Sequence, residues 1–272
     1  MENISKKNLF MLLALFIFLV IYLLILFFSN GGISNFNKGY ILVDNLTAFY
    51  CTKTECRASE LSNVDYEKNT FKEIDSSNEI KDNLKVTYDD VRFNISSNNK
   101  WLKATNEIVL FQDNLIIDPV NYSKIKLTRD DLEIINKVFD KYGFKYSNAN
   151  TYVYDIFEID INNDGVNDKI YHLSDNTRLD QKTLNYEIVF GVVNGNAYVL
   201  GVDSSLSPTS LHTFNIKSMF RMNNSNDLYV IIRRDGFSLS NDTSVSLKKI
   251  SNKVVEVASY KLDNEYKKEG LV

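Results

Sequence analysis

The chain has 272 residues, of which 44% are hydrophobic, and a net charge of −4 from 31 basic and 35 acidic residues. This composition is sufficient for a buried core and excludes a chain that is disordered over most of its length. Because acidic and basic residues are interspersed and no basic block occurs, the sequence does not favour nucleic acid as a partner.

An apolar segment, LFMLLALFIFLVIYLLILFF, occupies residues 9–28 and contains no charge, proline or glycine. A helix of this length spans about 30 Å, the thickness of the hydrocarbon core of a bilayer, so we predict a single transmembrane helix. Lysines precede it but do not follow it closely, and the positive-inside rule therefore predicts a cytoplasmic tail, 1–8, with residues 30–272 outside the cell membrane. A cleaved signal peptide is the alternative, although its apolar region is normally about 7–15 residues long.

Residues 29–38, rich in glycine, serine and asparagine, are expected to form a flexible stalk. Residues 39–125 contain short runs with strand character, separated by clusters of asparagine, serine and aspartate that are typical of turns. We therefore predict a small β-rich unit for residues 39–125.

Cys51 and Cys56 are the only cysteines of the chain. Outside the cytoplasm a disulfide between them is chemically permitted, and we predict that it closes a tight hairpin. Zinc is the alternative, but two thiols supply half of a tetrahedral site, and the only histidines, His172 and His212, are far away in sequence.

A second β-rich unit is predicted for residues 126–272. It begins with a helix over about 129–142, which has an apolar stripe at 3.6-residue spacing, Thr128 at its start and Gly143 at its end. Asn194 and Gly195, between two apolar runs, predict a hairpin with a two-residue turn. The expected fold class is α+β, mostly antiparallel β with one helix that covers a sheet, preceded by the transmembrane helix.

The segment DINNDGVND, residues 160–168, lies between two runs with strand character. Asp160, Asn162, Asp164 and Asp168 could supply side-chain oxygens, and Val166 a carbonyl oxygen, to a hard cation such as calcium. Strands on both sides and Tyr171 in the twelfth place exclude an EF-hand, which needs flanking helices and a glutamate there. The alternative is a polar turn, since asparagine and aspartate favour turns without any metal.

This segment resembles the strand-loop-strand calcium site of the FG-GAP and VCBS repeats of integrin-like propellers and bacterial surface proteins, which typically reads D-x-D-x-D-G-x-x-D. The resemblance covers one short loop and departs from the pattern at Asn162. It implies a structural calcium ion in a protein of the bacterial cell envelope, without implying the propeller fold.

No arrangement of catalytic residues stands out, so we expect a binding or scaffolding module rather than an enzyme. Its expected partners are the membrane, through residues 9–28, and cell-wall glycan or another envelope protein. Two alternatives stay open: a cell-envelope hydrolase that uses acidic residues, whose spacing is a property of the fold, and an accessory subunit of a membrane complex.

Overall fold

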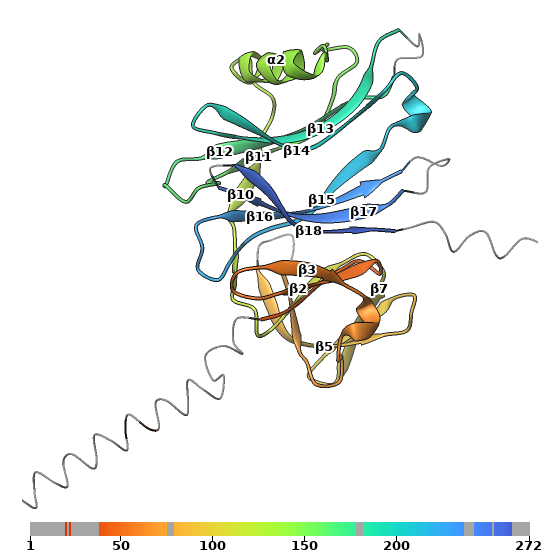
Figure 1. The fold of residues 1–272 in the computed structure, drawn as a ribbon, viewed down its shortest axis with the longest axis vertical. Coiled ribbons are helices and arrows are strands. Elements are labelled where there is room, and N and C mark those ends of the chain that lie inside the picture. Colours follow the sequence, from red (N-terminus) through yellow and green to blue (C-terminus); the bar gives the residue numbers. More distant parts are fainter. Residues whose placement is uncertain are drawn as a thin grey trace, which may run out of the picture.

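The structure is a computed structural model, and it describes residues 20, 22, 38–74, 79–177, 182–236, 242–251 and 253–262. Three antiparallel sheets and the helix α2 (Asp131–Tyr142) lie in layers, as Figure 1 shows. The helix covers the sheet of β10–β14, and the sheet that contains β15–β18 packs against the other face of this sheet. The sheet of β1–β8 packs on the far side of β15–β18.

The first sheet has eight strands in the order β3-β2-β1-β8-β4-β5-β6-β7. Its strands are β1 (Gly39–Val43), β2 (Thr47–Cys51), β3 (Cys56–Ser59), β4 (Phe71–Ile74), β5 (Ile80–Tyr88), β6 (Phe93–Ser97), β7 (Lys100–Thr105) and β8 (Val109–Gln112). Its strands β1, β2, β4, β5, β6 and β8 enclose a core of their own. Successive side chains of β1 point to opposite faces and pack in two different cores. Leu42 lies in this core, while Ile41 and Val43 pack toward the sheet of β15–β18.

The second sheet has the order β10-β11-β12-β13-β14. Its strands are β10 (Tyr122–Lys124), β11 (Tyr152–Ile159), β12 (Asp168–Asp175), β13 (Asn185–Val193) and β14 (Asn196–Ser205). The turn between β13 and β14 contains Asn194 and Gly195, both with positive φ (50° and 75°), which confirms the predicted hairpin. Both faces of this sheet are buried, one by α2 and one by the third sheet.

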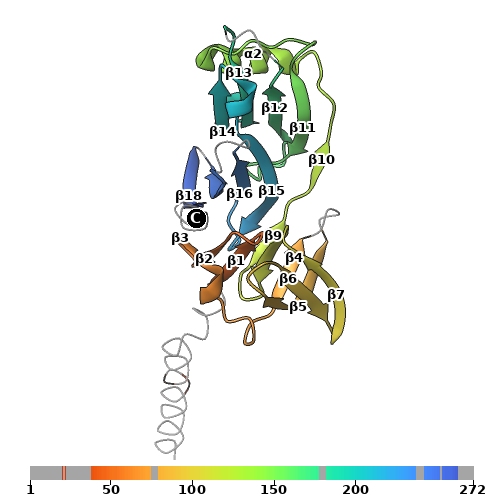
Figure 2. The same cartoon turned by 90° about the vertical axis from the view of Figure 1, so that its right-hand side faces the viewer.

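The third sheet has the order β18-β17-β16-β15-β9. Its strands are β9 (Ile117–Pro119), β15 (Thr213–Met222), β16 (Leu228–Asp235), β17 (Ser244–Ile250) and β18 (Val254–Lys261). The short β9 follows the first sheet in the chain but pairs with β15. The third sheet is thus the middle β-layer, and Figure 2 shows its strands between those of the other two sheets.

Helix α2 forms where the apolar stripe predicted it, and it buries Ile135, Val138 and Phe139 against the second sheet. Its start differs from the predicted cap. The Asp131 carboxylate accepts hydrogen bonds from the backbone N–H and the hydroxyl of Thr128, both at 2.7 Å, whereas the Thr128 side chain caps no N–H of the helix. The helix ends at Gly143 (φ 72°), as expected for a left-handed cap.

The predicted transmembrane helix requires a correction. Residues 9–28 lie outside the described residues except for Val20 and Tyr22, and no helix of the described part is long and apolar enough to cross a membrane. The helix α2 has 12 residues, so it spans about 18 Å, less than the hydrocarbon core of a bilayer, and its other face is polar. The fold class is antiparallel β with one covering helix, and the transmembrane helix ahead of it and the single-pass membrane location both lose their support.

The cytoplasmic tail 1–8 and almost all of the stalk 29–38 also lie outside the described residues. The boundary predicted at residue 125 stays a prediction. It falls between β10 and α2, yet β9 lies with β15 and one apolar core joins the first sheet to the third, so residues 39–125 share their packing with residues 126–272.

Candidate functional site

The acidic loop, residues 160–168, connects the ends of β11 and β12, so strands flank it as the sequence predicted. Its carboxylates accept hydrogen bonds from the loop backbone. Asp160 accepts from the N–H groups of Asp164 (3.1 Å) and Gly165 (2.9 Å), and Asp164 accepts from the N–H of Val166 (2.8 Å). Gly165 has φ 85°, which glycine adopts without strain. The loop is therefore a series of side-chain-to-backbone turns.

The last carboxylate of the loop, Asp168, is buried and accepts the N–H of Ile161 at 3.1 Å. Burial raises the pKa of Asp168, backbone hydrogen bonds oppose this, and the charges of Asp164 and Asp160 raise it further. Three like charges therefore lie near one another, which costs free energy at neutral pH. The side chain of Val166, in contrast, is 60% exposed.

Arg221 fixes the acidic loop to the third sheet. Its guanidinium group donates hydrogen bonds to the backbone carbonyls of Asp160 (2.6 Å) and Ile161 (3.2 Å), and also to the carbonyl of Asn226. The side chain of Asn163 donates to that of Asn226 at 3.0 Å. The loop is thus held against the β15–β16 end of the third sheet.

The calcium prediction is not supported by this geometry. Over the described ranges, no group of three or more His, Cys, Asp or Glu side chains is placed to hold a metal ion. The carboxylates of Asp160 and Asp164 face N–H donors of the loop, and Asn162 turns its amide N–H₂ toward Asp164 at 2.8 Å. The description of the chain as a calcium-binding protein is corrected accordingly, and calcium at residues 160–168 stays a prediction of the resemblance alone.

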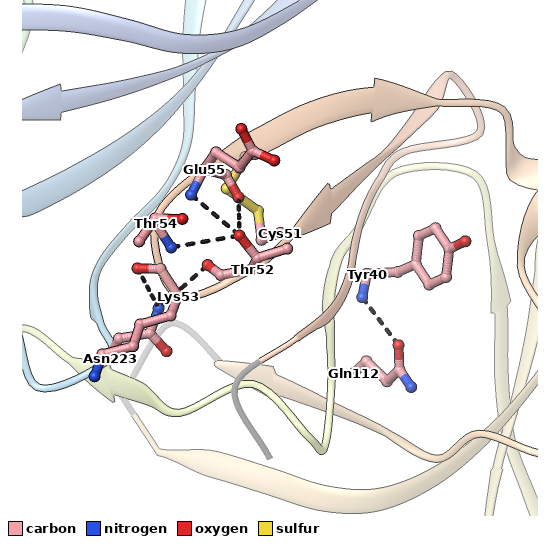
Figure 3. Close-up of a disulfide and its surroundings, with 9 residues drawn as sticks. Tyr40, Cys51, Thr52, Lys53, Thr54, Glu55, Gln112 and Asn223 are labelled. Carbon is pink, nitrogen blue, oxygen red and sulfur yellow. Dashed lines mark hydrogen bonds between the residues drawn. A yellow bond between two sulfur atoms is a disulfide. The ribbon is translucent and has the colours of Figure 1, made fainter. Parts of the chain in front are cut away.

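Cys51 and Cys56 form a disulfide, shown in Figure 3. They are the pair of facing residues nearest the turn between β2 and β3. The turn that it closes is also held by the N–H of Thr52, which donates to the carbonyl of Glu55 at 2.8 Å. Asn223, in the turn after β15, donates to the Thr52 carbonyl at 3.4 Å. The disulfide turn is therefore one of the contacts between the first and third sheets.

Both histidines lie in a polar cluster between the second and third sheets, which the sequence did not predict. The Nε2 atom of His172 lies 2.8 Å from Oε1 of Glu187, and the N–H of Phe214 donates to the same oxygen at 2.6 Å. Glu187 is 1% exposed. The ring of Tyr154 stacks on His172 with centroids 4.5 Å apart, and burial, assisted by the charge of Glu187, raises the pKa of Tyr154.

His212 belongs to the same cluster. Its backbone N–H donates to Oδ2 of Asp203, and its Nδ1 lies 2.8 Å from the same oxygen. Arg234 donates to Oδ1 of Asp203 at 3.4 Å, and its guanidinium group lies 2.9 Å from Nδ1 of His212. Asp203 and Glu187 are opposite each other in the β13–β14 ladder, so the two histidine–carboxylate pairs adjoin.

Each imidazole thus has a carboxylate partner, as the base of a hydrolytic triad has. Among the described residues, however, no serine, threonine or cysteine side chain hydrogen-bonds to His172 or His212. The hydrogen bonds from β15 and β16 to Glu187 and Asp203 instead join the two sheets. The strand pairing that creates this cluster is long-range, and the alternation of polar residues in β12 and β13 was its only signal in the sequence.

A third feature is the outer strand of the first sheet, β7, which is the last in the sheet order. Trp101 is 70% exposed and Leu102 is 48% exposed. The register shifts between Ile95 and Ser96, so that Trp101 pairs with Ser96 and Leu102 is the extra residue of a bulge. The bulge turns the only tryptophan of the chain to solvent.

Comparisons with known proteins do not extend these observations. No family model, curated protein or solved structure matches the chain. The resemblance of the acidic loop to FG-GAP and VCBS repeats therefore stays a prediction.

Proposed function

We propose that this chain is a non-catalytic binding module that takes up an extended segment of a partner protein along the edge strand β7. The observation that carries the proposal is Trp101, a large aromatic side chain that is 70% exposed on an outer strand. The free side of such a strand presents backbone N–H and C=O groups, which a partner strand can pair with. Large exposed aromatic residues next to such groups are typical of binding surfaces.

The chemistry of the strand indicates what the partner segment contains. Trp101 and Leu102 are both solvent-exposed and would contact apolar side chains of the partner. Lys100 precedes them and is exposed, and Lys85 lies on the same face as Trp101, across Ser96. A segment with alternating apolar residues and at least one carboxylate therefore matches β7. The lysines also disfavour indiscriminate pairing of this edge.

The test is selection from a library of random peptides displayed on phage, with the full chain as bait. We expect enriched peptides that alternate apolar and acidic residues. On binding, they shift the emission of Trp101 to shorter wavelength, and because Trp101 is the only tryptophan, this signal reports β7 alone. Trp101→Ser is expected to abolish the enrichment, whereas Ile80→Ser, which alters another exposed apolar residue of the same sheet, is expected to leave it intact.

Two results would overturn this proposal. One is equal enrichment on wild type and Trp101→Ser. The other is a concentration-dependent shift of Trp101 emission without any peptide, which would assign the edge to a second copy of the chain.

A second candidate function is hydrolysis by acidic residues, because Glu187 and Asp203 lie opposite each other and each holds a histidine. Against it, Glu187 is 1% exposed and accepts two hydrogen bonds on one oxygen. Turnover of a panel of fluorogenic glycosides that Glu187→Gln abolishes, without a change in melting temperature, would favour hydrolysis over the binding module.

A further inference from the structure

The third sheet carries polar residues on the face that packs against the second sheet. Only part of this face is apolar: Val230 and Ile232 of β16 lie in the core shared with the second sheet. Their partners on β17 are Lys248 and Ser246, so these polar side chains share the same inward face. A sandwich interior is normally apolar on both faces that meet, so an inner face of this kind indicates contact with water or a ligand.

A cavity of about 250 Å³ lies at this polar part of the face. Leu200, Phe214 and Ile232 provide its apolar side. Serine hydroxyls of β17 and β18 provide its polar side: Ser244, Ser246 and Ser259. Since one water molecule takes about 30 Å³, the cavity has room for about eight waters, or for an organic molecule of about ten heavy atoms.

The charges around the cavity are unbalanced. Its lining includes three cations, Arg234, Lys248 and Lys261, but one acid, Glu256. Lys248 is the most buried of these cations, with a side chain that is 19% exposed, and its nitrogen lies 3.9 Å from a Glu256 that is 49% exposed. Burial lowers the pKa of Lys248, and the charge of Glu256 opposes this. A largely buried ammonium group whose one partner is half exposed and at the outer limit of ion-pair distance is stabilised by an additional anion.

We propose that this cavity binds a small amphiphilic carboxylate. The carboxylate lies against the ammonium group of Lys248 with hydrogen bonds from the neighbouring serine hydroxyls, and the apolar chain lies against Leu200, Phe214 and Ile232. This site is separate from the β7 edge and does not depend on the function proposed there.

A carboxylate fits this site better than a phosphate does. Phosphate recognition commonly uses the planar fork of an arginine, but the guanidinium group of Arg234 already donates to Asp203 and lies 2.9 Å from Nδ1 of His212. Lys261 is 60% exposed and lies 3.9 Å from Asp242. Lys248 differs from the other two cations in its burial, since its side chain is 19% exposed and its partner Glu256 is 49% exposed. A single ammonium group of this kind suits a singly charged ligand.

The experiment is calorimetric titration of the folded chain with octanoate, beside octanol and octylamine as uncharged and cationic probes of equal chain length. We expect saturable binding of octanoate and none of octylamine. Lys248→Met keeps the length of the side chain and removes the charge, and it is expected to weaken octanoate binding at least tenfold, since a charge-assisted hydrogen bond is lost.

The matched control is Lys249→Met. This neighbouring lysine pairs with Asp227 at 3.2 Å and, as the next residue of the strand, points to the opposite face of the sheet, so its loss is expected to leave octanoate affinity unchanged. Ser246→Leu fills the cavity without removing a charge and is expected to abolish binding while the melting temperature stays the same or rises. The proposal is overturned if octanoate produces no saturable heat, if octylamine binds equally well, or if Lys248→Met and Lys249→Met have the same effect.

Discussion

One contact between the first and third sheets is made by a buried carboxylate, that of Asp44. It is 0% exposed and lies in the turn after β1. Its Oδ1 lies 3.0 Å from the ammonium nitrogen of Lys217 and accepts the backbone N–H of Ile108 at 2.9 Å, and its Oδ2 lies 3.0 Å from the guanidinium group of Arg233. Because Lys217 lies on β15 and Arg233 on β16, Asp44→Ala breaks the charged contact between the first and third sheets.

The expected cost follows from these contacts. Removing one partner of a buried ion pair costs about 3–5 kcal/mol of unfolding free energy, which includes the unsatisfied N–H of Ile108. Asp44 also has φ 50°, a conformation that costs alanine about 1 kcal/mol more than aspartate. We therefore expect Asp44→Ala to lose about 4–6 kcal/mol. Asp44→Asn keeps an acceptor and tolerates positive φ, so it is expected to lose about half as much.

The assay is urea unfolding followed by circular dichroism and by the emission of Trp101, which reports the first sheet. In the wild type the two probes are expected to give one transition. In Asp44→Ala the Trp101 transition is expected at lower urea than the dichroism transition, because the first sheet has lost its charged contact with the third. The matched control is Asp90→Ala, which removes an exposed aspartate with φ 65° and is expected to cost about 1 kcal/mol.

The reasoning is refuted if Asp44→Ala costs no more than Asp90→Ala. In that case the ion pairs of Lys217 and Arg233 contribute nothing beyond backbone conformation. It is also refuted if Asp44→Ala and Lys217→Met are additive in the double variant, since residues that share an ion pair are expected to couple.

Three further predictions concern acid, redox state and metal. Burial raises the pKa of Asp131, but hydrogen bonds from Lys169, Thr128 and Tyr171 outweigh this effect and lower the pKa to about 2. The Asp131 carboxylate therefore contributes about 2 kcal/mol to the free energy of unfolding above about pH 4, and this contribution is lost as the pH falls toward 2. In Asp131→Asn the urea midpoint is expected to change less between about pH 4 and about pH 2 than in the wild type. Reduction of Cys51–Cys56, which closes a loop of sequence separation 5, should cost about 2 kcal/mol or less by the same assay. Chelator is expected to leave the melting temperature unchanged, because Asp160 and Asp164 accept N–H groups of the loop and, over the described ranges, no group of three His, Cys, Asp or Glu side chains is placed to hold a metal ion. A rise in melting temperature with calcium that Asp160→Ala removes would contradict this.

The sequence predicted those elements that are encoded locally. Asn194-Gly195 identified the β13–β14 turn, since a two-residue turn with positive φ at both positions favours such a pair. The apolar stripe and Gly143 identified α2 to within two residues at its start. The capping detail differed because Asp131 turned back to Thr128 and to Lys169 of β12, and the second of these contacts depends on the tertiary fold.

The long-range pairing could not be predicted in this way. The strand β8 lies between β1 and β4, and β9 leaves its neighbours in the chain to pair with β15. Glu187 was one of many acidic residues in the sequence, and only the registers of β12, β13 and β14 bring it to His172 and Asp203. Local patterns determine which residues share a face of a strand, but the register determines which residues they meet.

The number of layers explains why the cavity was also not predicted. In SVSLKKI of β17, apolar and polar residues alternate, and in a two-layer protein the polar set would face water. Here Val245 and Leu247 pack toward the first sheet, so Ser246 and Lys248 must point toward the second sheet. A strand patterned for one buried face has thus been placed between two sheets. Burying this polar face costs free energy, and apolar substitutions would have removed it if only stability were selected. We therefore expect a functional site where the local pattern conflicts with the tertiary position in this way.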